Sequence, residues 1–461
     1  MMRTHPEPFD WRSVAEALAG LDIVTDAAER ATLSRDYYWY SPILKNALDS
    51  RCADLVVRPR NQAEVTRIAA LAAKRRLPVT VRGGGTGNYG QAVPLEGGIV
   101  IDMTRMDRVL DVSAGTARCE AGTLLWDLDQ AARRSGQALL MYPSTARIAT
   151  VGGFIAGGHS GIGSIRHGIL ADPGNVRSIR VVTLEESPRV IDLNDADIQK
   201  VHHAYGTNGI ITELTVALAP AVDWINVITC FDSYDAVLEL GLAAGARAMA
   251  GDGIDVFLLS AVERRIMPYY EALADRVRGR DAMFALVSPA TLPAYAALAA
   301  SLGGTQVLAM SDAELDAAGL PHAIECAYNH TTLTALKTDR SVTYLQVAFP
   351  PPLDIGLVRS LMEEFGDELY MHHEFARAYG HLTAFALPLV HYFDAERIAE
   401  IIAIFEARGC TVFNPHTYVL EDGGMKVVDT AQIDFKTRAD PLGLMNPGKT
   451  RGWTAPLPAP R

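Results

Sequence analysis

The sequence predicts an α+β fold with two domains, or with one split domain that carries an insertion. Its 461 residues, about half of them apolar, exceed what one hydrophobic core usually serves. Short β-branched runs and an amphipathic helix alternate in residues 54–103. Strand-like runs alternate with Ala-rich helical stretches in residues 221–409, without a fixed-period repeat.

Residues 54–103 give the clearest order of elements: strand, helix, strand, glycine-rich turn, strand. DLVVRP at 54–59 predicts a buried strand, LPVTV at 77–81 a second and GGIVIDM at 97–103 a third. Asn61 and Glu64 form a capping pair at the start of the helix between the first two strands. Four apolar residues recur in it at helical spacing: Val65, Ile68, Ala69 and Ala72.

The glycine-rich stretch VRGGGTGNYGQAVP contains the pattern G-x-G-x-x-G at Gly85, Gly87 and Gly90. A Rossmann fingerprint needs a helix directly after the glycines, but Pro94 and a Gly-Gly pair stand there. A flexible linker would join separate units, whereas this stretch lies between two β-branched strands. The remaining interpretation is a tight turn whose glycines adopt left-handed conformations and direct bare N–H groups at an anion.

Three further segments carry turn signals. A second glycine-rich segment, PSTARIATVGGFIAGGHSGIGSIRHG at 143–168, is either a pair of tight turns or a second grip on a diphosphate or a flat ring. YGTNGIITELTVAL at 205–218 predicts a turn into a strand. DPLGLMNPGKTRGW at 440–453 is a Pro/Gly turn with Asn446 and Lys449, and this lysine either meets a phosphate or ribityl oxygen or lies solvated at the surface.

The middle of the chain, residues 221–409, predicts an antiparallel sheet flanked by helices. Four runs in it are strand-like: WINVITCF, IDVFLLS, DAMFALVS and VTYLQVAF.

In these motifs the chain resembles the flavoproteins related to vanillyl-alcohol oxidase and p-cresol methylhydroxylase, most closely their glycolate oxidase and D-lactate dehydrogenase branch. The match consists of five motifs in family order: VVRPRNQAEV, VRGGGTGNYG, PSTARIATVGG, GTNGIIT and DPLGLMNPGK. The resemblance implies a two-subdomain FAD-binding domain of the PCMH type, built from residues 1–220 and from the return of the chain at 410–461. It also implies that residues 221–409 form a substrate or cap domain over the isoalloxazine.

The resemblance also implies which residues contact FAD. These are Gly83, Gly84, Gly85, Thr86, Gly87, Asn88, Pro143, Ser144, Thr150, Gly153, Gly158, Ser160 and Ile211, with Asn446 and Lys449 near the flavin. Relatives with covalent FAD commonly have a histidine where Thr86 stands, and some have a cysteine in the second segment, which this chain lacks. We therefore expect FAD to be held without a covalent bond through either position.

The branch typically has a G-H-x-G-D-G-N-x-H stretch and a later E-H-G stretch that together hold a divalent metal near the hydroxy acid. His381 and His416 match these stretches, but Thr383 and Ala384 replace the Gly-Asp pair, and Pro415 replaces the glutamate. A catalytic metal normally has three protein ligands. We therefore expect no metal, which also weakens the assignment of a 2-hydroxy acid substrate.

The mechanism that the resemblance implies is hydride transfer from an alcohol, hydroxy acid or phenol to the flavin, while a protein base takes the hydroxyl proton. We predict His416 as the base, because alternation in a strand-like run would place it on the same face as Tyr418, and the resemblance implies that this run lies over the flavin. Tyr418 would donate a hydrogen bond to the substrate, and His381 is the next candidate. Reduced flavin would pass its electrons to oxygen or another acceptor.

Two other functions stay open: a flavin-bearing electron-transfer or non-catalytic subunit of a larger complex, and a nicotinamide enzyme. A net charge of −12 and the absence of basic tracts near aromatic residues argue against nucleic acid as a partner. The sequence shows no secretory leader and no run long enough to span a membrane, which predicts a cytoplasmic protein. Five scattered cysteines predict no disulfide framework. The oligomeric state stays open, with a homodimer as one option.

Overall fold

A parallel three-stranded core with one antiparallel edge strand forms the first sheet. A computed structural model describes residues 9–426, 428 and 430–453. The strand order is β1 (Asp22–Val24), β2 (Leu55–Arg58), β4 (Ile99–Asp102) and β3 (Val79–Arg82). β2 and β3 both run parallel to β4. Parallel neighbours need a crossover, and helix α4 (Gln62–Arg75) supplies it.

Helix α4 forms as the sequence predicts. The Asn61 side chain accepts a hydrogen bond from the Glu64 N–H at 3.0 Å, and the Glu64 carboxylate accepts from the Arg60 N–H at 2.8 Å. The four apolar residues at helical spacing are all buried against the sheet. After β3 the glycine-rich stretch leads directly into β4 without a helix, so the prediction against a Rossmann turn is confirmed.

The second sheet is antiparallel. It consists of β5 (Val109–Ser113), β6 (Thr116–Glu120), β10 (Ile210–Pro220), β8 (Val176–Val182) and β9 (Val190–Asn194) in this order, with β7 (Gln137–Leu139) paired to β10. The predicted turn into a strand after residue 205 is therefore β10.

The third sheet has eight antiparallel strands. In order they are β14 (Thr305–Met310), β11 (Ile225–Phe231), β13 (Asp281–Val287), β12 (Val256–Val262), β18 (His372–Ala378), β19 (His381–Ala386), β16 (Val347–Ala348) and β21 (Thr411–Val412). A fourth, small sheet consists of β15 (Val342–Tyr344), β20 (Leu389–His391) and β17 (Leu369–Tyr370) in this order. Its strands come from the same part of the chain as the third sheet. The antiparallel sheet predicted for the middle is confirmed, but the run VTYLQVAF is divided between β15 and β16, which belong to different sheets.

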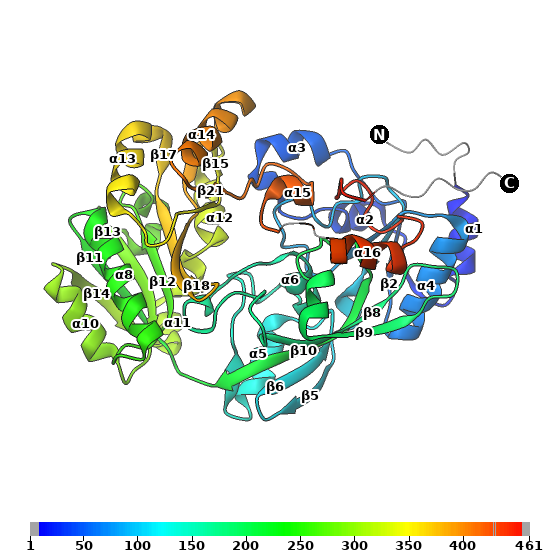
Figure 1. Cartoon of the computed structure of the whole chain (residues 1–461), viewed down its shortest axis with the longest axis horizontal. Helices are drawn as coiled ribbons and strands as arrows, with labels where there is room; N and C mark the ends of the chain where they lie inside the picture. The colour runs from blue at the N-terminus through cyan, green and yellow to red at the C-terminus, as the bar shows by residue number, and fades with distance from the viewer. Residues whose placement is uncertain (1–8, 427, 429, 454–461) are drawn as a thin grey trace.

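Helices cover the sheets, and Figure 1 shows the third sheet with its helices on one side of the molecule and the first two sheets on the other. The remaining α-helices are α1 (Trp11–Ala17), α2 (Ala27–Leu33), α3 (Pro42–Leu48), α5 (Leu125–Arg133), α6 (Val151–Gly157), α7 (Ser164–His167), α8 (Tyr234–Ala250), α9 (Ala274–Val277), α10 (Leu292–Ser301), α11 (Asp312–Ala318), α12 (Asn329–Thr338), α13 (Ile355–Phe365), α14 (Ala395–Ala407), α15 (Leu420–Gly423) and α16 (Thr430–Ala439). Among the described residues, no helix is both long and apolar enough to cross a membrane.

The last part of the described chain returns to the first two sheets. The Leu184 N–H donates to the Ala439 carbonyl at 2.7 Å, and Val79 in β3 forms a parallel bridge with Met445. The sequence predicts a strand around His416, in the segment that leads from the third sheet to this return. The prediction is wrong beyond Val412, where β21 ends. The chain turns there because Pro415 has no N–H, and the Asn414 side chain accepts from the His416 N–H at 2.9 Å.

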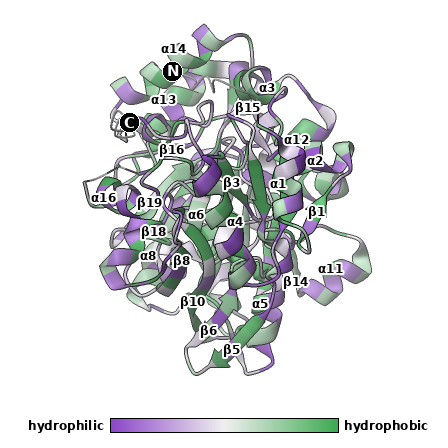
Figure 2. Cartoon of the chain, turned by 90° about the vertical axis from the view of Figure 1, so that its right-hand side faces the viewer, coloured by the Kyte–Doolittle hydropathy of each residue, from purple (hydrophilic) through white to green (hydrophobic). Residues whose placement is uncertain are grey.

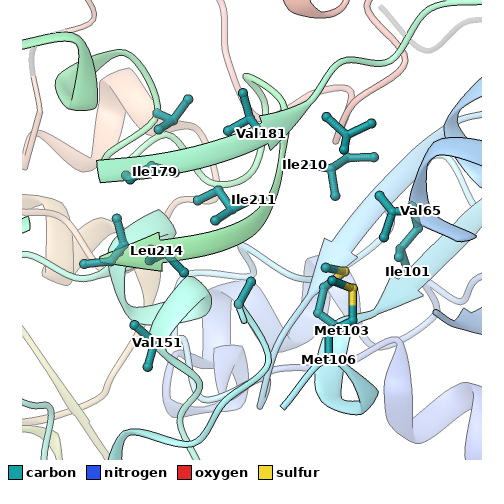
Figure 3. Close-up of a cluster of buried hydrophobic side chains, with 14 of the residues drawn as sticks. Val65, Ile101, Met103, Met106, Val151, Ile179, Val181, Ile210, Ile211 and Leu214 are labelled. Atoms are coloured by element: carbon teal, nitrogen blue, oxygen red, sulfur yellow. The ribbon is translucent and has the colours of Figure 1, made fainter. Parts of the chain in front are cut away.

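One hydrophobic core joins the first two sheets. Figure 3 shows side chains of α4 and β4, such as Val65 and Ile101, facing those of β8 and β10, such as Val181 and Ile210. A separate core fills the space between the third sheet and its helices. In Figure 2 the inner strands carry hydrophobic residues, whereas helix α11 alternates hydrophilic acidic residues with hydrophobic ones. Four of the five cysteines are buried, and Cys52 is exposed; all are free thiols.

Buried histidines make the stability of this fold depend on pH. Burial lowers the pKa of His203 and His373 to about 3 and that of His416 to about 4. The unfolded chain takes up protons on these rings below a pH of about 6.5, whereas the folded chain does not. Stability that is present above this pH is therefore lost as the pH falls toward 4. We expect the Tm to fall steadily between about pH 6.5 and 5 in scanning calorimetry, and a constant Tm there would contradict the burial of neutral imidazoles.

Candidate functional site

A cavity of about 240 Å³ lies between the two glycine-rich segments and the third sheet. Thirteen of the predicted cofactor contacts line it: Gly83, Gly84, Gly85, Thr86, Gly87, Asn88, Pro143, Ser144, Thr150, Gly153, Gly158, Ser160 and Ile211. The residues come from the turn that follows β3, from the segment after β7 that contains helix α6, and from β10, and the folding of the first two sheets brings these segments together.

The first glycine-rich segment turns carbonyl groups toward the protein. The Gly87 carbonyl accepts from the Tyr37 N–H at 2.6 Å, and the Gly90 carbonyl accepts from the Lys449 ammonium. In the described part of the chain, no acceptor contacts the amide N–H groups of residues 84–88. These donors are therefore available to an anion, as in a backbone nest.

The two glycine-rich segments approach so closely that side chains do not fit between them. A Cβ at Gly83 would lie 2.0 Å from Thr150 Oγ1, and a Cβ at Gly84 would lie 2.0 Å from the Ile148 carbonyl oxygen. Thr150 also caps helix α6, because its hydroxyl accepts from the Gly153 N–H at 3.2 Å. The glycines thus form a cradle that only bare backbone allows.

Two ionisable groups lie beside the first segment. Asp36 accepts hydrogen bonds from two backbone N–H groups, at 3.0 and 3.1 Å, and burial raises its pKa to about 6. Arg82 donates to the carbonyl oxygens of Arg35 and Gly84. Both side chains line the cavity, but their hydrogen bonds go to the backbone.

The opposite side of the cavity is formed by residues 328–413, and its aromatic and amide side chains are here called the sheet-side wall. It contains Tyr328, Asn329, Gln346, Phe385 and Phe413. Across the cavity the Tyr89 hydroxyl donates to the Gln346 side-chain oxygen at 2.6 Å, which joins the first glycine-rich segment to this wall.

Tyr328 has an unusual backbone conformation, with φ 51° and ψ −139°. Its N–H donates to the fully buried Glu374 carboxylate at 2.6 Å, and its hydroxyl donates to the Gly161 carbonyl at 2.8 Å. A positive φ in a bulky residue is strained and persists only where surrounding contacts hold it. These two hydrogen bonds fix the Tyr328 phenol at the edge of the cavity.

His159, from the second glycine-rich segment, also lines the cavity. Its ring packs against those of Phe385 and Phe413, with centroid distances of 5.9 and 6.2 Å. Burial lowers the pKa of His159 to about 4, so the imidazole is neutral at pH 7. It can therefore accept a proton or a hydrogen bond from a molecule in the cavity.

Asn446 and Lys449, which the resemblance implies to lie near the flavin, do not line the cavity. The Asn446 amide donates to the carbonyl oxygens of Gln91 and Tyr205 at 2.7 and 2.6 Å, and the Lys449 ammonium donates to that of Gly90. Lys449 is fully buried, which excludes a solvated surface lysine, and burial lowers its pKa to about 7. Both residues therefore stabilise the backbone of the first glycine-rich segment by hydrogen bonds, without lining the cavity themselves.

The three predicted catalytic residues also lie outside the cavity lining. His416 is buried, with Nδ1 2.7 Å from the Ser41 hydroxyl, because the chain turns at Pro415 and does not continue as a strand. The Tyr418 ring packs under the Lys449 ammonium at 5.1 Å. His381 is exposed at the start of β19. Among the described residues, no three His, Cys, Asp or Glu side chains are grouped as metal ligands.

Sequence reasoning missed most of the sheet-side wall and its neighbours. The missed lining residues with polar or aromatic side chains include Asp36, Arg82, Tyr89, Gln91, His159, Tyr205, Tyr328, Asn329, Gln346, Phe385 and Phe413. His159 lies within a segment that the sequence had singled out, so its position was a usable signal. The sheet-side wall comes from distant segments without a local motif.

Comparison with known proteins identifies the domain that carries the two glycine-rich segments. Residues 53–190 match a family described as "FAD binding domain". The chain is 33% identical to D-lactate dehydrogenase of Archaeoglobus fulgidus over 224 residues, which cover 45% of this chain and 48% of that protein. It is 30% identical to the glycolate oxidase subunit GlcD of Escherichia coli over 199 residues, which cover 41% of this chain and 39% of that protein.

A third relative, D-2-hydroxyglutarate dehydrogenase of Escherichia coli, is 38% identical over 169 residues, or 35% of this chain and 15% of that protein. The chain thus matches about half or less of the length of these relatives. A solved structure of alkyldihydroxyacetonephosphate synthase has the same fold over 97% of this chain and 86% of its own, with a TM-score of 0.70 and 15% identity.

These matches confirm the family resemblance. Residues 53–190 match an FAD-binding domain, and part of the chain is similar to D-lactate dehydrogenase and to the GlcD subunit of glycolate oxidase.

Proposed function

We propose that this protein is an FAD-dependent oxidoreductase that oxidises a small hydroxylated molecule. The observation that carries the proposal is the cavity, because one side is the pair of glycine-rich segments of the FAD-binding domain and the other is the sheet-side wall. The relatives, named as a dehydrogenase of D-lactate, a dehydrogenase of D-2-hydroxyglutarate and a glycolate oxidase subunit, support a redox function.

The residues present fit FAD. The free amide groups of residues 84–88 suit its pyrophosphate, and the absence of a Cβ at Gly83 and Gly84 lets this segment lie directly against residues 148–150 of the second segment. When bound, FAD supplies a two-electron acceptor, so that an alcohol loses a carbon-bound hydride to it and a hydroxyl proton to the protein and becomes a carbonyl compound. The thirteen lining residues predicted from the sequence would hold it.

The proposal includes the domain boundaries that the sequence predicts. Residues 1–220 and 410–461 would form the FAD-binding domain in two subdomains, with residues 221–409 as the cap that carries the sheet-side wall. The contacts of Ala439 and Met445 with the first two sheets support the return of the chain. The electron acceptor, whether oxygen or another molecule, a homodimer and a cytoplasmic location remain predictions.

His159 is the group that we assign as the proton acceptor. It lines the cavity and is neutral at pH 7, and it lies between the FAD-binding segment and two aromatic residues of the sheet-side wall. His416, which the sequence favours for this role, contacts Ser41 behind the cavity. The role of Tyr328 would be to position the substrate hydroxyl, since Glu374 and Gly161 fix its phenol.

Anaerobic flavin bleaching tests the proposed function. The purified holoprotein is mixed with a panel of alcohols, hydroxy acids and phenols, and absorbance near the flavin maximum is followed. Bleaching by one class of compound supports the proposal. A protein that holds FAD but is bleached by none of them would instead favour the alternative, an electron-transfer or non-catalytic subunit.

FAD should be released by acid. Thr86 occupies the position of the usual covalent histidine, and no cysteine lies between Cys119 and Cys230. Precipitation with trichloroacetic acid should therefore leave a yellow supernatant and a colourless pellet. A yellow pellet would reveal a covalent bond, and peptide mapping should then look first at His159, the cavity-lining histidine.

Turnover should survive chelation. The carboxylate partners that the metal-binding relatives supply are replaced here by Thr383, Ala384 and Pro415, and His381 and His416 lie outside the cavity. Dialysis against EDTA should leave the flavin reduction rate unchanged. Elemental analysis that finds about one zinc or manganese ion per chain, with activity lost on its removal, would overturn this expectation.

A further inference from the structure

The charges around the cavity are confined to one side of it. Among the described lining residues, the formally charged side chains at neutral pH are Asp36 and Arg82. Both lie beside the first glycine-rich segment, and both make their hydrogen bonds with backbone groups. The side that faces the third sheet therefore offers no formal charge to a ligand.

Two arginines of the second glycine-rich segment are engaged with other groups. Arg166 pairs with Asp255 at 2.9 Å, and the Arg147 guanidinium packs over the Trp126 ring at 4.2 Å. Neither arginine lines the cavity, and His159 is neutral there because burial lowers its pKa to about 4. A carboxylate placed against the sheet-side wall would have no cation to compensate its charge.

The polar side chains of the sheet-side wall are uncharged phenols and amides. The Tyr328 and Tyr89 hydroxyls already donate to Gly161 and Gln346, so each phenol oxygen has only lone pairs left. The side-chain oxygen of Asn329 is buried and has no hydrogen-bond partner among the described residues. Such a wall suits an uncharged hydroxyl group, which both donates and accepts, better than a carboxylate, which would meet no cation there.

Resting on the proposed function, we infer that the substrate is an uncharged alcohol with an apolar or aromatic body, and not a hydroxy acid of the kind named for the relatives. Phe385 and Phe413 would contact the body, and the Asn329 amide would form a hydrogen bond with a hydroxyl group. This assignment separates the chain from the three relatives through the uncharged sheet-side wall, which lies outside residues 53–190 that match the FAD-binding domain.

Matched pairs of substrates test the inference on the holoprotein. Propane-1,2-diol is compared with lactate, and 1-phenylethane-1,2-diol with mandelate, each as both enantiomers, because the members of a pair differ only in a hydroxymethyl group against a carboxylate. We expect the diols to reduce the flavin at least about tenfold faster at equal concentration, because the carboxylates would be buried without a partner. Faster reduction by lactate or mandelate would overturn the inference and leave the proposed oxidoreductase function intact.

Binding of the same compounds tests the preference for an uncharged alcohol over a carboxylate even without turnover. Their effect on the absorbance spectrum of the bound flavin gives a Kd for each. Tighter binding of the diols supports the inference, and tighter binding of the carboxylates overturns it. If flavin stays oxidised with every compound, the proposed function fails, but the order of these Kd values still tests the composition of the wall.

A variant that adds a cation to the wall provides the converse test. Asn329→Arg should raise the rate ratio of mandelate to its diol at least about tenfold, since it places a guanidinium where the wall is neutral. Gln306→Arg adds the same charge at an exposed position of the edge strand β14 and is the matched control. An unchanged ratio in Asn329→Arg, equal to that of the control, would count against the inference.

Discussion

Replacing Gly84 with alanine is expected to remove FAD from the protein while the fold survives. The added Cβ would lie 2.0 Å from the Ile148 carbonyl oxygen, a backbone atom that cannot move without separating the two glycine-rich segments. Overpacking of this kind costs about 1–3 kcal/mol, so FAD affinity should fall by at least about tenfold. The measurements are the flavin content after purification and the Kd for FAD from titration of the apoprotein.

Gly157→Ala, in the second glycine-rich segment, is the matched control. Its Cβ would meet no atom closer than the Gln91 side-chain nitrogen at 3.5 Å, an ordinary van der Waals distance. The control should therefore retain FAD nearly as well as the original protein, and circular dichroism of both apoproteins should show the same fold. Equal FAD affinities in Gly84→Ala and Gly157→Ala would mean that the close approach of the segments does not matter for the cofactor.

The elements that lead to the glycine-rich side of the cavity could be predicted from local rules, and the family resemblance implied its contact residues. A strand, a capped helix and a second strand lead into the glycine-rich turn, and each is recognisable from neighbouring residues. The close approach of the backbone at residues 83 and 84 requires glycine, and the sequence has glycine at both positions. All thirteen contacts predicted in the two glycine-rich segments and β10 line one cavity.

The sheet-side wall could not be predicted in the same way. Gln346 lies where the chain passes from one sheet to another, and the strained Tyr328 depends on a buried carboxylate 46 residues further on. Such positions follow from long-range packing and leave no periodic pattern. His416 was misplaced for a related reason, since alternation was extended through Pro415, where the chain in fact turns.

His159→Gln should slow flavin reduction by about a hundredfold or more while FAD stays bound. Glutamine keeps a neutral, hydrogen-bonding side chain against Phe385 and Phe413 but cannot take up a proton, and general base catalysis is typically worth about 10²–10⁴-fold. Stopped-flow measurement of the anaerobic reduction, with the best substrate of the panel, gives the rate directly. His416→Gln is the comparison variant, because burial lowers the pKa of His416 to about 4 as well but the ring lies behind the cavity.

The pH dependence of the same rate gives a second readout. A base must be unprotonated to act, and burial holds the pKa of His159 at about 4, so the rate should stay level from about pH 8 to 5.5 and fall only as the pH approaches 4. An ordinary histidine would instead cause the fall near a pH of about 6.5. If His416→Gln is slowed a hundredfold and His159→Gln is not, the proton leaves the substrate by another route, and His416 must approach the cavity in a conformation that differs from this one.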